Sequence, residues 1–410
     1  MKVLKNGSSG LFNLFGNQIE ENGIEYDYHK YLIRNGDVVY NCFTGEVVQI
    51  EDENLDKHEL ISKWYMIPKE LDPRGIAYLS REIRLNRSAA LTSVNRYTIF
   101  TTVKCNASCE YCFQHGGINA YMDDDTANKI ADYIINNSPK LEQIKITWFG
   151  GEPLVNKKPI NIICSRLRNR NLNYVSEMSS NGYLFDKVTD AEIFLWNLKK
   201  VQFTADLPGK EYDKMKGLPE GAYDKLRETF LRLSNLGVLS QIRVHYHPKY
   251  GLEKSKQIVD DFKGIRSVSM YPAMIYDANR TIADYDNLLA LEDYMVDNKV
   301  LRFEPGNPGR PVYCMGDNPS SRCIRVDGTF TTCEHFFEGN TIGSVTATEI
   351  DYDLISEWKK KRKHEIKCYD CPLYPTCELL ANCPSIGRCE DGYGYFRVEE
   401  IRNALRRYDV

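Results

Sequence analysis

The stretch VKCNASCEYCFQHGG, residues 103–117, contains three cysteines, Cys105, Cys109 and Cys112, within eight positions. It follows YTIFTTV (97–103), a run of β-branched and aromatic residues that predicts a buried strand. The cysteines therefore lie in a loop at the carboxyl end of a strand. Metal and cluster sites with no open position usually have four protein ligands. Whether a fourth ligand is present therefore decides what kind of site this loop forms.

Strands and helices alternate beyond this loop. DDDTANKIADYIINN (123–137) predicts a helix, and a later helical pattern ends at Gly237 as its C-cap. This alternation predicts a parallel sheet built from βα units, and six units are too few for a closed eight-unit barrel. We therefore expect an α/β fold, an incomplete (β/α)6 barrel with its site at the carboxyl ends of the strands. The predicted strands are 97–103, 144–149, 174–180, 201–206, 241–246 and 268–273.

The two ends of the chain have different patterns. The first 95 residues predict a small α+β module, with two strands around the turn at Asn35-Gly36 and a helix in DENLDKHELISKWYMI (52–67). This module could hold a peptide, or it could be a structural cap on the barrel. From about residue 305 the pattern is irregular until a terminal helix at VEEIRNALRRY (398–408). The predicted domains are 1–95, 96–305 and 306–410.

Composition limits the class of protein. The net charge of −4 excludes a strong overall field that would attract nucleic acid. No apolar run approaches the ~20 residues that span a bilayer, and no signal peptide is recognisable. These features predict a cytoplasmic protein without membrane or nucleic-acid partners, in a compartment that keeps thiols reduced. There, clustered cysteines predict metal or cluster sites, while the isolated Cys42 and Cys164 predict ordinary buried thiols.

Three thiolates would leave one iron of a four-iron cluster without a protein ligand. An open position of this kind binds substrate or cofactor, as the open position of a catalytic zinc does. The missing ligand is therefore the functional feature of the loop. His115, close by in the sequence, is the competing candidate for a fourth ligand.

CNASCEYCF (105–113) resembles the cluster motif of radical SAM enzymes, in which an aromatic residue, here Tyr111, precedes the last cysteine. The resemblance implies that the three loop cysteines bind a [4Fe–4S] cluster whose open iron is chelated by S-adenosyl-L-methionine. In that family one electron from the cluster cleaves the sulfonium to a 5′-deoxyadenosyl radical, which abstracts hydrogen from the substrate. An electron donor such as flavodoxin or ferredoxin is then a required partner.

Further stretches extend the resemblance along the chain. WFGGEPLV (148–155) is similar to the family's Gly-Gly-Glu-Pro motif, and SSNGYL (179–184) ends the third predicted strand. QFTADLPGKEYDKMKG (202–217) resembles a Ser/Thr-x-Asp-Gly-Pro stretch, with Leu207 in place of the glycine. The glycine pair lets backbone approach a ligand closely, and the following carboxylate could receive the cofactor's ammonium. The implied cofactor-binding residues are Tyr111, Gly150, Gly151, Glu152, Pro153, Ser180, Asn181, Thr204, Asp206 and Arg243.

The eight C-terminal cysteines resemble those of the SPASM domain, which extends many radical SAM enzymes that act on peptides and proteins. The resemblance implies two auxiliary [4Fe–4S] clusters, hence three clusters in all. Five residues separate Cys377 from Cys383, where relatives usually have three. Two zinc ribbons are the alternative interpretation. The implied ligand sets are Cys314, Cys323, Cys333 and Cys383 for one cluster, and Cys368, Cys371, Cys377 and Cys389 for the other.

The resemblance implies a peptide or protein substrate, possibly with a leader segment held by the N-terminal module. The leading interpretation is a maturase that forms a thioether or C–C crosslink in a ribosomally synthesised peptide. The alternative is an anaerobic sulfatase-maturing enzyme that makes formylglycine. In those relatives an aspartate follows the cysteine matched by Cys333; here Glu334 follows, and a carboxylate can act as the catalytic base. Epimerisation, peptide excision, and a non-catalytic iron–sulfur or zinc-binding protein also stay open.

Overall fold

The computed structural model describes residues 1–7, 23–50, 56–89, 93–114, 120–139, 142–274, 282–301, 315–317, 320–336, 339–347, 349–360, 365–377, 382–383, 387–388 and 391–408. The chain forms two compact units. The terminal unit comprises 1–91, 303–318 and 358–410, and the barrel unit comprises 92–302 and 319–357. The three-domain division expected from the sequence stays a prediction. Within the described ranges, no helix is long and apolar enough to cross a membrane.

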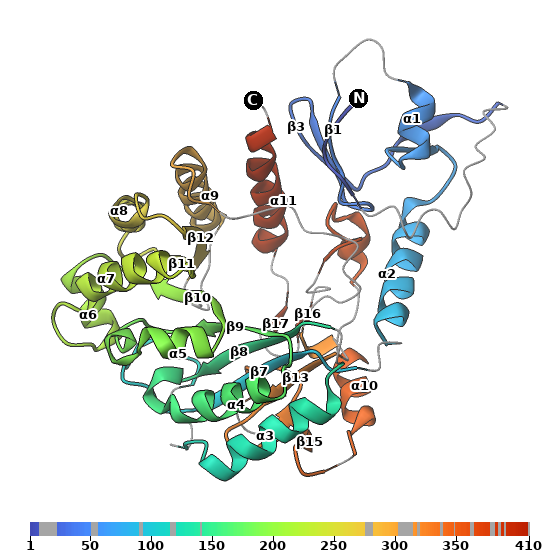
Figure 1. Cartoon of the computed structure of the whole chain (residues 1–410). Coiled ribbons are helices and arrows are strands. Elements are labelled where there is room, and N and C mark those ends of the chain that lie inside the picture. Colours follow the sequence, from blue (N-terminus) through green and yellow to red (C-terminus); the bar gives the residue numbers. More distant parts are fainter. Residues whose placement is uncertain are drawn as a thin grey trace. The chain divides into compact units, whose positions relative to one another are not determined.

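The barrel unit is built on a sheet in which six parallel strands, β7 to β12, lie side by side in sequence order. The connecting helices form a layer along one side of this sheet (Figure 1). The expected incomplete (β/α)6 barrel is thus confirmed. Its elements are β7 (Arg96–Thr102), α3 (Asp124–Asn137), β8 (Ile144–Gly150), α4 (Lys158–Asn169), β9 (Tyr174–Ser179), α5 (Asp190–Leu195), β10 (Leu198–Ala205), α6 (Lys210–Lys216), α7 (Ala222–Asn235), β11 (Leu239–Tyr246), α8 (Leu252–Phe262), β12 (Val268–Met274) and α9 (Ile282–Asp297).

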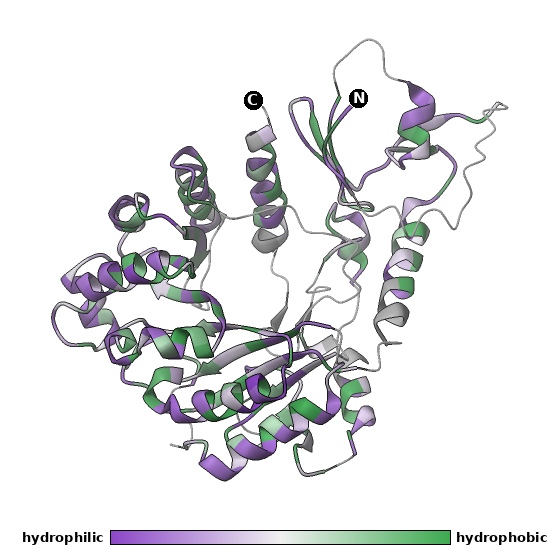
Figure 2. Cartoon of the chain, in the orientation of Figure 1, coloured by the Kyte–Doolittle hydropathy of each residue, from purple (hydrophilic) through white to green (hydrophobic). Residues whose placement is uncertain are grey.

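Local signals set the helix ends in this layer. The Asp123 side chain accepts a hydrogen bond from the backbone N–H of Thr126 at 2.7 Å and caps α3. Helix α7 ends at Asn235 with Leu236 as its C-cap, so the C-cap expected at Gly237 lies one residue earlier. Gly237 follows the cap, and its φ of 71° is the left-handed conformation that glycine adopts at low cost. Figure 2 shows hydrophilic and hydrophobic residues alternating along these helices, as expected for a layer with one buried face.

The two faces of the sheet differ in polarity. On β10, Val201, Phe203 and Ala205 are buried, and the Phe203 ring packs on Phe230 of α7 with centroids 4.7 Å apart. Gln202 alternates with these residues and is partly exposed on the opposite face. The face without helices is therefore the polar interior of the incomplete barrel.

Three further strands extend the sheet beyond β7, where the sequence predicted only irregular structure. They are β13 (Ser321–Ile324), parallel to β7, then β14 (Thr329–Thr331) and β15 (Thr341–Ser344), both antiparallel to their neighbours. The sequence pattern did not indicate these strands because each is only three or four residues long. The partner of β13 on β7 also lies more than 200 residues earlier, so no local periodicity indicates that pairing.

The terminal unit contains a four-stranded sheet in the order β1-β5-β4-β3. The predicted turn at Asn35-Gly36 is confirmed, because Asn35 pairs with Val38 and Gly36 has a φ of 53°. The helix predicted over 52–67 is shorter, since Met66–Pro68 forms a strand. The elements are β1 (Lys2–Lys5), β2 (Tyr26–Tyr28), β3 (Leu32–Asn35), β4 (Val38–Asn41), β5 (Val47–Gln49), α1 (Lys57–Ser62), β6 (Met66–Pro68), α2 (Pro73–Ala89), α10 (Tyr352–Lys360, shared with the barrel unit), β16 (Asn382–Cys383), β17 (Gly387–Arg388) and α11 (Asp391–Leu405).

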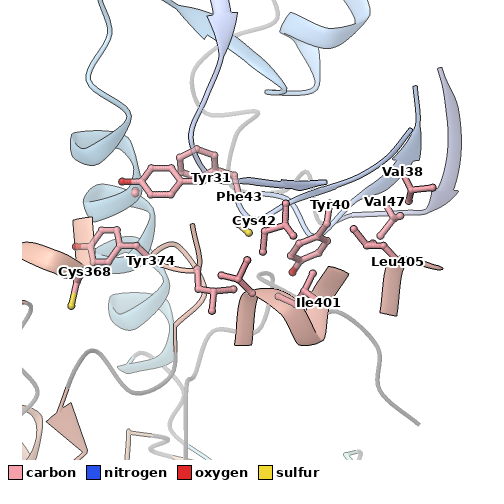
Figure 3. Close-up of a cluster of buried hydrophobic side chains, with 14 residues drawn as sticks. Tyr31, Val38, Tyr40, Cys42, Phe43, Val47, Cys368, Tyr374, Ile401 and Leu405 are labelled. Carbon is pink, nitrogen blue, oxygen red and sulfur yellow. The ribbon is translucent and has the colours of Figure 1, made fainter. Parts of the chain in front are cut away.

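Both ends of the chain contribute to one hydrophobic core in this unit. Tyr40 and Cys42 come from the N-terminal sheet and its following loop, and Ile401 and Leu405 come from α11 (Figure 3). All four side chains are buried. The burial predicted for Cys42 and Cys164 is confirmed. The N-terminal sheet therefore buries its apolar face partly against a helix made more than 300 residues later.

Candidate functional site

The cysteine loop, residues 103–114, leaves the carboxyl end of β7. The N–H of Cys112 donates to the carbonyl of Cys109 at 3.1 Å, which closes a turn between these two cysteines. The sulfur of Cys105 accepts a hydrogen bond from the N–H of Ala107 at 3.3 Å. Backbone donors aimed at sulfur favour the thiolate form, which is the form that binds iron. His115, the alternative fourth ligand, lies outside the described residues.

Gly150 and Gly151 bring the end of β8 against the backbone of the cysteine loop. A Cβ atom on Gly150 would lie 2.1 Å from the carbonyl oxygen of Thr102, and one on Gly151 would lie 2.4 Å from that of Lys104. The N–H of Glu152 also donates to the Lys104 carbonyl at 2.9 Å. Only glycine permits this approach, so the glycine pair fixes the shape of the loop.

Glu152 joins the ends of β8 and β9 from a fully buried position. Its carboxylate accepts hydrogen bonds from the Ser180 hydroxyl at 3.0 and 3.1 Å, the Asn181 N–H at 2.7 Å and the Leu154 N–H at 3.1 Å. Burial raises the pKa of Glu152 to about 7, although these hydrogen bonds oppose the rise. Pro153 follows as the first residue of a short 3₁₀ helix. Glu152 thus accepts bonds from the protein's own donors and holds the two strand ends together.

Asn181 connects β9 to the cysteine loop. Its side-chain amide donates to the Asn106 side-chain oxygen at 2.8 Å and lies 3.7 Å from the Cys105 sulfur. Its backbone carbonyl accepts a hydrogen bond from the Tyr212 hydroxyl at 3.1 Å. The loop is therefore held from two neighbouring strands, β8 through the glycine pair and β9 through Asn181.

A buried polar network holds the loop from the opposite side. The Tyr111 hydroxyl donates to the Asp206 carboxylate at 2.7 Å and accepts from the Lys216 ammonium at 2.7 Å. Lys216 also forms an ion pair with Asp206 at 2.8 Å, and His245 contacts the same carboxylate through Nδ1 at 2.6 Å. Because a carboxylate only accepts, Nδ1 of His245 is the donor.

The charges of this network follow from its burial. Burial opposes ionisation of Asp206, but the charge of Lys216 and the hydrogen bond from His245 overcome it and hold the pKa of Asp206 below its usual range. Burial lowers the pKa of His245, so its ring is neutral near pH 7. Asp206 and Lys216 therefore form a buried ion pair of zero net charge beside the cysteine loop.

The polar interior of the barrel continues from this network. Thr204, Arg243 and Tyr271 are cross-strand neighbours on β10, β11 and β12. The Arg243 Nε donates to the Tyr271 hydroxyl at 2.8 Å. On β8 and β9 the Thr147 hydroxyl donates to Glu177 at 3.3 Å. These groups make a surface suited to a polar ligand.

Comparison with known sequences identifies one matching family. A family model described as a 4Fe-4S single cluster domain matches residues 95–212, which include the cysteine loop. A curated relative, the uncharacterized protein MJ0907 of Methanocaldococcus jannaschii, is 31% identical over 99 residues. That alignment covers 22% of this chain, and the chain spans about a third, 34%, of the relative's length.

Solved structures share the architecture over most of the chain. The structure of anSMEcpe with bound AdoMet has a TM-score of 0.58 at 16% identity and covers 76% of this chain and 97% of that one. The protein has the radical SAM fold. Streptococcus suis SuiB bound to S-adenosylmethionine has a TM-score of 0.54 at 12% identity and covers 87% of this chain and 95% of that one. The resemblance predicted from the cysteine motif is therefore confirmed.

The residues at this edge of the radical SAM fold fit a cluster with an open iron. The donor set comprises three cysteines, and a backbone N–H is already directed at the sulfur of Cys105. Among the side chains that the structure describes, no three cysteine, histidine or carboxylate groups are gathered tightly enough to hold a single ion.

In the barrel unit, two of the predicted auxiliary ligands lie beside the radical SAM strands. Cys323 is buried on β13, and Cys333 is buried just after β14. The Cys333 sulfur lies 3.7 Å from the carboxylate of Glu334. The next residue, His335, stacks on Phe113 of the cysteine loop with ring centroids 4.5 Å apart. The segment that carries Glu334 is therefore packed against the loop.

In the terminal unit, Cys368 and Cys371 are joined by a turn like that of the cysteine loop, with the Cys371 N–H donating to the Cys368 carbonyl at 3.1 Å. The Cys368 sulfur accepts from the Glu365 N–H at 3.4 Å, and Figure 3 shows it pointing away from the labelled core side chains. The guanidinium of Arg81, fully buried, donates to the carbonyl of Cys377 at 3.0 Å. The Cys368 sulfur is thus oriented away from the core and stabilised by a backbone donor, as expected for a ligand.

Three of the predicted C-terminal ligands fall outside the described part of the chain. They are Cys314, Cys389 and the side chain of Cys383. The two sets of four cysteines therefore stay predictions.

Neither Lys216 nor His245 was predicted as a site residue. The two-residue alternation of a strand places His245 on the same face as Arg243, so a signal for it was present. Lys216 is the last residue of α6, and no local pattern indicates that its charge meets that of Asp206.

Proposed function

We propose that this protein is a radical SAM maturase that acts on a ribosomally synthesised peptide and forms a thioether or C–C crosslink within it. The observation that carries the proposal is the meeting of three sequence motifs at one edge of the sheet. The cysteine loop, the turn at Gly150–Glu152 and the pair Ser180-Asn181 are joined there by direct hydrogen bonds. A purely structural role would not require three closely spaced cysteines in a loop that is fixed by contacts from several strands.

Cys105, Cys109 and Cys112 would hold a [4Fe–4S] cluster and leave one iron for S-adenosyl-L-methionine. Together these groups would supply a 5′-deoxyadenosyl radical that abstracts one hydrogen from the substrate, and an auxiliary cluster would accept the further electron that is released, with a proton, when the crosslink closes. The protein fixes the loop through its two glycines and through Asn181. Arg243 is a suitable partner for a carboxylate because a guanidinium binds one through two parallel hydrogen bonds.

The proposal of a peptide substrate is supported by the share of the chain that the structural similarity covers. The SuiB structure bound to its precursor peptide SuiA covers 87% of this chain at a TM-score of 0.53, whereas anSMEcpe covers 76%. The polar barrel interior would hold the reacting segment, and the N-terminal module would hold a leader segment. An electron donor such as flavodoxin or ferredoxin would act with the protein in the cytoplasm.

Two auxiliary clusters complete the proposal. Cys323 and Cys333 belong to the first predicted set, and Cys368, Cys371 and Cys377 to the second. The backbone donor at the Cys368 sulfur and the buried guanidinium beside the Cys377 carbonyl are features that favour bound thiolate. Four cysteines per site would close both clusters to substrate.

Iron content tests the cofactor assignment. Protein reconstituted under anaerobic conditions should hold roughly twelve irons, since each [4Fe–4S] cluster contributes four. The Cys105→Ala, Cys109→Ala, Cys112→Ala triple variant should lose about a third of the iron and all cleavage of S-adenosylmethionine. Cys164→Ala, which removes a buried cysteine outside the sites, is the matched control. Cleavage retained by the triple variant would contradict the assignment, and a wild type without cleavage would favour a non-catalytic metal protein.

Mass spectrometry tests the reaction. The protein is co-expressed anaerobically with the short peptide encoded nearest to it, and intact and fragment masses of the peptide are compared with and without the enzyme. Loss of two hydrogens, with fragmentation suppressed between two residues, is the result expected for a crosslink. A peptide whose mass does not change in the presence of active enzyme contradicts the crosslinking proposal.

Formylglycine formation is the second candidate, favoured by the position of Glu334. Its segment packs against the cysteine loop through the stack of His335 on Phe113, and this contact supports a role for the neighbouring carboxylate in the reaction. A carboxylate there could take the proton of a substrate thiol or hydroxyl. Incubation with a sulfatase segment tests this reaction: Glu334→Gln should abolish formylglycine formation but keep cleavage of S-adenosylmethionine, and equal loss of both would argue against a base at this position.

A further inference from the structure

The carboxyl end of α6 docks directly on the cysteine loop. The N–H of Ser108 donates to the carbonyl of Lys216 at 2.7 Å. Gly217, with a φ of 60°, ends the helix, and a Cβ atom there would lie 2.0 Å from the Ser108 hydroxyl. The left-handed φ favours glycine here, and a Cβ atom would displace the Ser108 hydroxyl. The helix end thereby places Lys216 beside the residue that precedes Cys109.

Lys216 brings a buried positive charge to this contact. The residue is 3% exposed, and its ammonium is shared between the Asp206 carboxylate and the Tyr111 hydroxyl. Tyr111 lies between Cys109 and Cys112 in the loop. Burying a cation is costly unless it is paired. The ion pair with Asp206 offsets this cost while the ammonium keeps its hydrogen bond to Tyr111 in the loop.

The Lys216 ammonium is fixed beside the loop by geometry, since it donates to the hydroxyl of Tyr111, which lies between Cys109 and Cys112. A cluster bound by thiolates gains one further negative charge when it takes up an electron. Iron–sulfur reduction potentials respond to such nearby charges and hydrogen bonds, so a fixed cation favours the reduced state.

We propose that Lys216 is a positioning residue whose buried ammonium, held by Asp206 and Tyr111 against the cysteine loop, raises the reduction potential of the cluster bound there. The inference rests on the proposed function, since it requires that cluster. Asp206 is the counter-charge, so removing Lys216 and removing Asp206 change the net charge beside the loop in opposite directions. If Lys216 and Asp206 had only a structural role, removing either one would not shift the reduction potential in opposite directions.

The test is a reductive titration of the full chain, reconstituted under anaerobic conditions, with dithionite supplying the electrons. The variants are Lys216→Met, Asp206→Asn, the double variant and Lys216→Arg. Electron paramagnetic resonance follows the cluster whose spectrum changes on adding S-adenosylmethionine, which separates it from the auxiliary clusters. The titration is run at about pH 8.5, well above the usual pKa of histidine, about 6.5, so that neutral His245 is favoured in every variant.

At a fixed potential, Lys216→Met should lower the ratio of reduced to oxidised cluster by about tenfold, and Asp206→Asn should raise it by a similar factor. A tenfold change corresponds to 59 mV for one electron. The double variant, with no net change of charge, should return to within about threefold of wild type. Lys216→Arg, which keeps the charge, should do the same.

Shifts of the same sign in both single variants, or no shift in either, would overturn the inference. If Lys216→Met does not load a cluster, the Asp206→Asn variant decides alone: an upward shift supports the inference and an unchanged potential refutes it. A wild type without a cluster that responds to S-adenosylmethionine would instead refute the proposed function. The two failures are thus distinguishable.

Discussion

The shared core of the terminal unit predicts that Leu405→Ala in α11 loosens the N-terminal sheet. The Leu405 side chain is fully buried among core residues that include Val38 and Val47 of β4 and β5. Truncating a buried leucine to alanine costs about 2–5 kcal/mol. Leu405 is the last residue of its helix, where the surroundings can partly close the cavity, so we expect about 2–3 kcal/mol. Amide exchange in the sheet should then be about 30- to 150-fold faster.

Hydrogen exchange followed by mass spectrometry measures this effect on the reconstituted protein, in peptides that cover residues 32–49. Arg402→Ala is the matched control, because Arg402 is exposed on the same helix and its ion pair with Glu399 is at the surface. The control should leave exchange in the sheet within about twofold of wild type. If Leu405→Ala also does so, α11 does not stabilise the sheet and the reasoning fails.

Three further predictions concern the loop, the buried carboxyl and the C-terminal turn. Gly217→Ala should lower the thermal midpoint more than Gly221→Ala. Both glycines have positive φ, but of the two only Gly217 would bring its new Cβ against another residue, Ser108. Equal changes in the midpoint would contradict the docking contact. Burial raises the pKa of Glu152 from 4.5 to about 7, so the folded protein binds this proton more tightly than the unfolded chain does. The resulting stabilisation is fully present below about pH 4.5 and is lost as pH rises through about 7. The difference in unfolding free energy between wild type and Glu152→Gln, from chemical denaturation at pH 4.5 and pH 8, should therefore shift by about 3 kcal/mol in favour of the variant at high pH, and parallel profiles would contradict it. Arg81→Met should cost about a third of the iron while cleavage of S-adenosylmethionine persists; full iron content would show that the guanidinium is not needed there.

Features with local causes were predictable from the sequence. The β-branched run before the cysteine loop forms β7 at Arg96–Thr102. The Asn35-Gly36 turn and the left-handed Gly237 just after α7 followed from the conformations these residues adopt readily. The cysteines directly follow that run, which placed them at the carboxyl end of a strand, and the loop is found there. In each case the signal lies within a few residues of the feature it predicts.

Features that depend on distant segments were not predictable. Strand β13 pairs with β7 across more than 200 residues, and its four residues have too few alternations to indicate a strand. The ion pair of Lys216 with Asp206 depends on how α6 packs at the end of β10. The shared core of the two chain ends is likewise a matter of tertiary packing. The sequence showed that β4 is apolar, but not which helix covers it.

The shared core also has a consequence for synthesis. Helix α11 leaves the ribosome about 350 residues after β5, which at about 5–20 residues per second takes roughly 20 to 70 s. During that interval the N-terminal strands have an apolar face without the helix that covers it in the folded protein. A nascent chain in this state offers chaperones an early binding site. Truncations or fusions that disturb α11 would then fail first at the opposite end of the sequence.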